Sequence, residues 1–214
     1  MISRRSLLAV LGLGPLAACA TRPPVQQAAV DPDSAWYIGE RPDHPHNIPL
    51  VDLKRLNPEF VRQAVPYTGP ERPGTIVVDI DRRQLFLVEP GGQAIRYGVG
   101  VGKQGFSWRG AATVGRKAKW PGWSPTMTMV SLGRASAGHR EGGLANPLGA
   151  RALYLYQGGR DIMFRIHGTH EPWSIGDQVS SGCIRMLNED VADLYERVPV
   201  GTTVLVKRGG RYRV

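Results

Sequence analysis

The chain has 214 residues, 42% of them hydrophobic and 21% charged, with a formal net charge of +9. This is the composition of an ordinary globular protein with a core large enough for one domain, and it contains only two cysteines, which excludes a disulfide framework. No apolar run reaches the 18 or so residues of a membrane-spanning helix, and scattered rather than clustered Lys and Arg argue against nucleic acid as a partner.

The first 19 residues have the features of a secretory signal. Arg4 and Arg5 precede a short apolar stretch and a run of small residues. "SRRSLL" resembles a twin-arginine export signal, and "LAAC" resembles the lipobox of bacterial lipoproteins, where cleavage leaves a lipid on Cys19. Ordinary cleavage near Cys19 is the alternative. We therefore predict a periplasmic, exported protein, with membrane anchoring through lipid at Cys19 as the first reading.

The composition changes twice after this signal. Residues 20–33 are rich in Pro, Ala and Gln and predict a flexible linker. Residues 34–73 predict an N-terminal extension packed on the main domain, in which "VDLKRLNPEFVRQAV" forms a short helical stretch broken at Pro58. Residues 74–207 predict one catalytic domain, and residues 208–214 a C-terminal tail.

The main domain is predicted to be mainly β, as a sandwich or barrel with a short helix after Cys183. Short β-rich runs alternate with Gly- and Pro-containing turns. One helix is expected near the end, because Val191, Leu194, Tyr195 and Val198 share one face. Asn188 is expected to be its N-cap, and Pro199 and Gly201 follow it. The expected strands are "TIVVDI", "QLFLVE", "AIRYGVGVG", "ATVGRKAKW", "ALYLY", "IMFRIH" and "TTVLVK".

Residues 167–188 gather the groups that a nucleophilic cysteine needs. If Cys19 is lost or lipidated, Cys183 is the only cysteine thiol of the mature chain. His167 ends a predicted strand and is a candidate general base, and Arg185 can lower the pKa of the thiol. Gly182 can expose backbone N–H groups to an oxyanion.

Two other interpretations of these residues stay open at this point. Cys183 can be a buried structural cysteine, and His167 a core histidine. His167, His170 and Cys183 can also be zinc ligands, although the segment "HGTHEPW" has loop character and offers no helix face to align the two histidines. The remaining histidines lie in distant segments, at His44, His46 and His139.

The stretch "IHGTHEPWSIGDQVSSGCIRMLNEDVADLYERVPVGTTV" resembles the active-site signature of the L,D-transpeptidase catalytic domain, often called the YkuD domain. The matching elements are His167-Gly168-Thr169, Gly176, Ser180 to Arg185, and Met186 to Asp190. The segments "NPLGARALYL" and "TIVVDIDRRQLFLVE" also resemble the family, and the likeness covers residues 74 to 207. Two departures stand out. Ser181 occupies a position where many members carry histidine, and the Thr-Pro-x-Gly element is replaced within "VGKQGFSWRGAATVGRK".

The resemblance implies a β-rich L,D-transpeptidase domain that cross-links peptidoglycan stem peptides through a cysteine thioester. It implies Cys183 as nucleophile, His167 as general base, and the Gly168 carbonyl as the group that orients the imidazole. It implies oxyanion contacts from Ser181, Gly182 and Cys183, substrate contacts from Thr169 and Trp173, and for Arg185 either a stem-carboxylate clamp or a structural ion pair. It implies no metal or organic cofactor, and a monomer is expected.

Several functions compete with this one. The same site can use water as acceptor, as a carboxypeptidase or an amidase. A sortase also orders His, Cys and Arg along the chain, but with a longer His-to-Cys gap. A non-catalytic wall-binding lipoprotein is the third class. Trp120, Trp123 and Trp173, with the 121–150 loops, are expected either to form a water-excluding lid or simply to pack.

Overall fold

The computed structural model describes residues 32–102, 108–133, 135–180 and 182–208. The expected signal, most of the expected linker, Ser181 and most of the expected tail lie outside these ranges. Within them, no helix combines the length and the apolar character that crossing a membrane requires.

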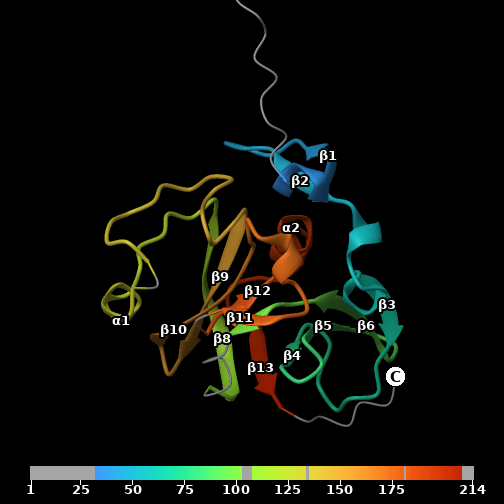
Figure 1. Cartoon of the computed structure of the whole chain (residues 1–214). Helices are drawn as coiled ribbons and strands as arrows, with labels where there is room; N and C mark the ends of the chain where they lie inside the picture. Colours follow the sequence, from blue (N-terminus) through green and yellow to red (C-terminus); the bar gives the residue numbers. More distant parts are fainter. Residues whose placement is uncertain (1–31, 103–107, 134, 181, 209–214) are drawn as a thin grey trace, which may run out of the picture. The chain divides into compact units, whose positions relative to one another are not determined.

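The described chain is mainly β, as predicted (Figure 1). Nine strands form one mixed sheet in the order β12-β10-β9-β8-β13-β4-β5-β6-β3. Neighbours run antiparallel except for the pairs β13–β4 and β10–β12. The strand bounds are β3 Gln63–Pro66, β4 Ile76–Asp79, β5 Gln84–Glu89, β6 Gln93–Gly98, β8 Gly110–Lys119, β9 Arg151–Gln157, β10 Arg160–His167, β12 Ile184–Arg185 and β13 Thr203–Lys207.

One face of this sheet packs with helix α2 (Asn188–Arg197) into the largest core. Alternate residues such as Leu153, Leu155, Ile166 and Ile184 are buried there together with Leu194 of the helix. Because successive side chains of a strand point to opposite faces, their neighbours in β9, β10 and β12 lie on the other face. We call this other side of β9, β10 and β12 the non-core face, and it is the side on which His167 and Arg185 lie.

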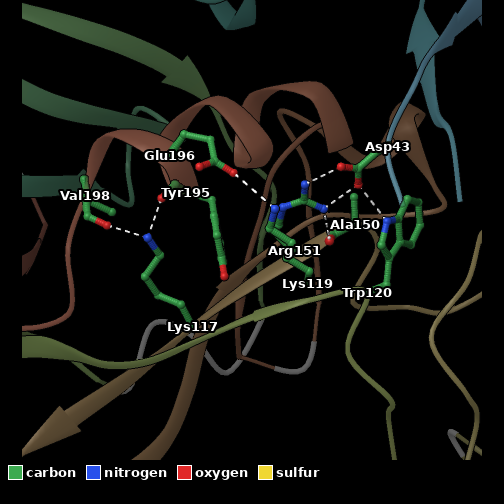
Figure 2. A network of polar contacts seen from close by, with 9 residues as sticks. All are labelled: Asp43, Lys117, Lys119, Trp120, Ala150, Arg151, Tyr195, Glu196 and Val198. Atoms are coloured by element: carbon green, nitrogen blue, oxygen red, sulfur yellow. Dashed lines mark hydrogen bonds and ion pairs between the residues drawn. The ribbon is translucent and has the colours of Figure 1, made fainter. Parts of the chain in front are cut away.

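The predicted apolar face of α2 is confirmed, but the predicted N-cap is wrong. Val191 and Leu194 are fully buried. Leu187, not Asn188, is the N-cap residue, because the Asn188 side chain instead bonds to two loops near His167. At the other end of α2, Lys117 of β8 donates to the backbone oxygens of Tyr195 and Val198, at 2.6 and 2.7 Å. Figure 2 shows this lysine cap, which satisfies carbonyls that a helix end leaves without partners.

The expected short helical stretch broken at Pro58 is present only as two 3₁₀ turns, Leu53–Arg55 and Pro58–Phe60, and residues 34–73 contain no α-helix. The side chains of Asp52 and Asn57 accept hydrogen bonds from backbone N–H groups two residues later and start two 3₁₀ turns. The chain then becomes strand β3, which pairs with β6 at the edge of the sheet. The other elements of this segment are η1 Pro32–Trp36, β1 Tyr37–Arg41, β2 Ile48–Val51, η2 Leu53–Arg55 and η3 Pro58–Phe60.

A buried ion pair joins this N-terminal segment to the sheet. Arg151, at the start of β9, donates to both carboxylate oxygens of Asp43 at 2.7 and 2.8 Å, and its side chain is only 3% exposed. The indole N–H of Trp120 donates to the same carboxylate at 2.8 Å (Figure 2). The Arg151 hydrogen bonds, and then Trp120, lower the pKa of Asp43 to about 2, so the carboxylate is ionised at neutral pH.

The remaining elements are short and lie in the connections. They are β7 Val101–Gly102, α1 Met127–Ser131, η4 Pro172–Ser174 and β11 Gln178–Ser180, of which β7 and β11 pair in parallel. Trp120 packs with Ile48, Ala150 and Ala192, so it belongs to a core cluster rather than to a lid. Trp123 lies in the 121–150 connection and pairs through its backbone with Arg140.

Candidate active site

Strand pairing brings His167 and the Cys183 segment together. β10 and β12 run in parallel, with Ile166 opposite Ile184 and His167 opposite Arg185. Ile166 and Ile184 enter the core, so His167 and Arg185 lie on the non-core face. Cys183 directly precedes β12, next to Arg165 of β10, and continues the same alternation. The nucleophile and the base predicted from the sequence therefore lie diagonally across two adjacent strands.

His167 is held in one orientation by its own turn. Its side chain is buried, and its Nδ1 lies 2.6 Å from the backbone oxygen of Gly168. A carbonyl oxygen can only accept, so Nδ1 carries the proton and Nε2 keeps its lone pair in the neutral ring. Burial lowers the pKa of His167 to about 4, and the charges of Arg185 and Arg165 act in the same direction. The imidazole is thus a neutral base at neutral pH.

Cys183 is a half-buried thiol with a raised pKa. Burial is the main cause, and it outweighs the opposite effects of the Arg165 backbone and of the Arg165 and Arg185 charges. The resting pair is therefore a neutral thiol beside a neutral imidazole. Such a pair can be activated by general-base catalysis, in which the imidazole accepts the thiol proton as the sulfur attacks.

Backbone geometry determines two of the glycine positions. Gly182, next to Cys183, has φ +142°, a conformation that favours glycine. Gly168 has no room for a side chain, because a Cβ there would collide with the Asn188 carboxamide. Gly182 and Gly168 were both predicted as site residues from the sequence.

Asn188 is a buried residue that the sequence analysis treated only as a helix cap. Its Oδ1 accepts from the N–H of Ala150 at 2.9 Å, and its Nδ2 donates to the backbone oxygen of Thr169 at 2.8 Å. These bonds span Gly168, whose own N–H donates to the oxygen of Arg151 at 3.0 Å. The turn that orients His167 is therefore fixed from β9 and from α2. In the sequence, Asn188 stands directly before Glu189 and Asp190, a pattern typical of a helix cap. That pattern predicts a bond to the helix backbone rather than the observed bonds to Ala150 and Thr169.

The three expected substrate-contacting residues lie in or beside the loop after His167. Arg185 donates to Glu171 at 2.6 Å in an ion pair that is 18% and 35% exposed on its two sides. The Thr169 hydroxyl accepts from the Glu171 N–H at 3.0 Å, inside the turn. Trp173 is 37% exposed, and its ring lies 6.2 Å from that of Trp36.

The residues considered as zinc ligands do not form a described cluster. In the part of the chain that the structure describes, no group of three or more His, Cys, Asp or Glu side chains is placed to hold a metal ion. His46 lies against Trp120, and His139 is near Ser124 and Glu141.

Comparisons with known proteins match this chain to one family. The profile of the YkuD family, described as the L,D-transpeptidase catalytic domain, matches residues 73–206. The probable L,D-transpeptidase ErfK/SrfK of Escherichia coli K12 is 34% identical over 140 residues, which are 61% of this chain and 43% of that protein. The probable L,D-transpeptidase YcfS of the same organism is 30% identical over 179 residues, 74% of this chain and 55% of that protein.

A solved structure from Brucella melitensis, named as a probable carnitine operon oxidoreductase, is also similar. It shares 49% sequence identity with a TM-score of 0.50 and covers 71% of this chain and 96% of its own. The chain spans about half the length of the curated relatives ErfK/SrfK and YcfS. The family profile, by contrast, covers more than half of this chain and includes both His167 and Cys183. The protein belongs to the L,D-transpeptidase catalytic domain family.

Proposed function

We propose that this protein is a peptidoglycan L,D-transpeptidase. The observation that carries the proposal is the arrangement of His167 and Cys183 on one face of two paired strands, with Nδ1 of His167 held by the Gly168 carbonyl. This orientation leaves Nε2 as the basic nitrogen, which is what a neutral thiol requires. Membership of the family supports peptide-bond exchange as the reaction.

In the first half-reaction Cys183 is the nucleophile and His167 the base. The sulfur attacks the carbonyl of the third residue of a tetrapeptide stem, usually diaminopimelate, and Nε2 takes the thiol proton. The tetrahedral intermediate then collapses, the C–N bond breaks, and the imidazolium returns the proton to the departing D-alanine amine. The products are a Cys183 thioester and free D-alanine.

In the second half-reaction an amine of a neighbouring stem attacks the thioester. Nε2 takes a proton from this amine, a C–N bond forms, and the C–S bond breaks. The expelled thiolate recovers the proton from the imidazolium, which restores the neutral pair. The net reaction exchanges one amide for another, so its atoms balance without a metal or an organic cofactor.

The other predicted residues take supporting roles in this proposal. Backbone N–H groups at Gly182 and Cys183, with Ser181, stabilise the oxyanion. Thr169 and Trp173 contact the substrate beside His167. Of the two roles considered for Arg185, its ion pair with Glu171 favours the structural one. The oxidoreductase activity in the name of the Brucella structure is not part of this proposal. The proposed groups around Cys183 are a nucleophile, a base and backbone donors, which suit acyl transfer.

Export and anchoring are part of the same proposal. A periplasmic location, with lipid on Cys19, brings the domain to stem peptides and agrees with the "LAAC" element. Mass spectrometry of the mature protein tests the anchor. A chain that begins at Cys19 and carries lipid is expected, and an unmodified N-terminus at or after residue 20 would contradict it.

Products formed from purified tetrapeptide muropeptides test the proposed reaction. The wild-type protein is expected to release D-alanine and to form cross-linked dimers, and Cys183→Ala is expected to form none. Tripeptides without dimers would identify water as the acceptor, as in a carboxypeptidase. Unchanged muropeptides would favour the amidase or the non-catalytic lipoprotein, and dimers formed by Cys183→Ala would remove Cys183 from the mechanism.

A further inference from the structure

A β-bulge places an arginine on the same face as Cys183. Val114 of β8 pairs with Leu155, but Arg116 pairs with Tyr154, so Gly115 is the extra residue of a register shift. Without the shift, Arg116 would share the core face with Val114. With it, Arg116 lies opposite Tyr154 on the non-core face. Bulges of this kind re-aim side chains and are common beside active sites.

The pairings extend this position into a row that ends at the nucleophile. Tyr154 of β9 lies between Arg116 of β8 and Arg165 of β10. Arg165 in turn adjoins Cys183, because the next residues, Ile166 and Ile184, are partners. β10 also changes register between Asp161 and Arg165, so both neighbours of β9 are bulged beside Tyr154. Three side chains from three adjacent strands, followed by Cys183 directly before β12, thus form one row across the sheet.

The row concentrates positive charge on one aromatic ring. The guanidinium carbon of Arg116 lies 3.4 Å from the centroid of the Tyr154 ring, and that of Arg165 lies 4.7 Å from it. Tyr154 is buried, so the ring is a fixed support for both cations. Two cations on one ring repel each other, and an anion near both offsets this repulsion.

Only part of this charge is balanced within the protein. Arg165 is paired with Asp161, at 3.1 Å. On the same face, Arg185 is paired with Glu171. Arg116 is exposed, and no carboxylate within the described ranges forms an ion pair with it. One preoriented guanidinium therefore remains available to a ligand, three strands from Cys183.

We propose that Arg116, held on Tyr154 beside Arg165, is a specificity-determining residue that binds a free carboxylate of the stem peptide. The proposal rests on the proposed function. Strands are spaced by about 4.8 Å, so the backbones of Arg116 and Cys183 are separated by roughly 14 Å, much of which an arginine side chain covers. An extended peptide advances about 3.3 Å per residue. The carboxylate that is bound lies within two or three residues of the scissile carbonyl, on the second residue or on the diaminopimelate side chain.

Steady-state kinetics with amidated stems test this subsite. Three tetrapeptide stems are compared: one with both carboxylates free, one amidated at the second residue and one amidated at the diaminopimelate side chain. Arg116→Gln is expected to raise KM for the free stem about tenfold, with little change in kcat, the scale of one charged hydrogen bond. For the wild-type protein, amidation of the carboxylate that Arg116 binds is expected to raise KM by the same factor of about ten. For Arg116→Gln, the same amidation is expected to leave KM unchanged.

A matched control and a binding measurement complete the test. Arg160 is also an exposed arginine, at the far end of β10, and Arg160→Gln is expected to retain the wild-type KM. Calorimetric titration of the free stem into Cys183→Ala, with and without Arg116→Gln, measures binding without turnover, and thermal unfolding confirms that the variants fold. Equal effects of the two arginine variants, or equal loss with all three stems, would overturn the subsite. Arg116-dependent binding without turnover in the wild type would instead contradict only the proposed reaction.

Discussion

The protonation state of His167 follows from where its side chain is placed. Burial outweighs the Gly168 hydrogen bond, so the pKa of the imidazole falls from 6.5 to about 4. The same burial raises the pKa of the Cys183 thiol. The site therefore differs from a thiolate–imidazolium pair, in which both groups are charged before the substrate arrives.

The pH dependence of kcat/KM tests this neutral pair. Because His167 is protonated only below about pH 4, kcat/KM is expected to stay level from pH 7 to pH 5 and to fall as the pH drops through about 4. Alkylation of Cys183 by iodoacetamide is expected to accelerate at a pH above the ordinary thiol range. Fast alkylation that persists from neutral pH down to about pH 4 would indicate a preformed ion pair instead. An acid limb at pH 6.5 would indicate an imidazole with its ordinary pKa.

The sequence predicted the candidate catalytic residues but not the residues that hold them in place. Cys183 and His167 could be proposed because a thiol and an imidazole sixteen residues apart have a chemical meaning, and Gly168 because the segment resembles a family signature. Asn188 bonds to Ala150 and Thr169, and the Asn188–Ala150 contact spans 38 positions. Arg116 reaches the non-core face only through a bulge. Tertiary packing decides the Asn188 bonds and strand register decides the position of Arg116, and neither is visible in a single sequence.

At the scale of elements, short β-rich runs predicted the strands well, and the helical spacing of apolar residues predicted α2. "QLFLVE" and the apolar face of α2 lie where the patterns placed them. Around Pro58 the expected helical stretch is limited to two 3₁₀ turns, because Asp52 and Asn57 bond to the local backbone and the chain then pairs with β6 as strand β3. The β1–β2 hairpin and the short strands β7, β11 and β12 were not predicted as separate elements. Each of these strands has too few residues to show a hydrophobic periodicity in the sequence.

The ion pair between Asp43 and Arg151 offers a test of how the N-terminal segment is held. Asp43→Asn is expected to lower the free energy of unfolding by about 2 kcal/mol at pH 7, because it leaves a buried guanidinium without its countercharge. Chemical denaturation measures the change.

Glu196→Gln is the matched control. It removes the carboxylate that faces Lys119, an exposed pair at 3.8 Å (Figure 2), and should cost less than about 0.5 kcal/mol of unfolding free energy.

The stabilisation by the Asp43 pair also depends on pH. The pKa of Asp43 is lowered, so its contribution to stability is complete above pH 3.8 and is lost as the pH falls toward 2. Equal costs for the two variants at pH 7 would show that the Asp43 pair does not hold the segment.

At the scale of the whole molecule, composition and charge indicated a basic globular protein of one domain but did not indicate its reaction. A net charge of +9 suits an anionic cell surface. The reaction was inferred from about twenty residues around Cys183, and the family profile extends that inference to residues 73–206. Residues before 32 lie outside the described ranges, so export and lipid attachment rest on the sequence.

If a stem peptide is transferred through Cys183, its thioester intermediate can be trapped on that residue. Purified protein is mixed with a tetrapeptide stem, quenched in acid within seconds and digested for mass spectrometry. We expect a peptide containing Cys183 that is heavier by the mass of the tripeptide stem minus water, with an equal amount of D-alanine released. No adduct should form in Cys183→Ala. An adduct on another residue, or D-alanine release that persists in Cys183→Ala, would contradict it.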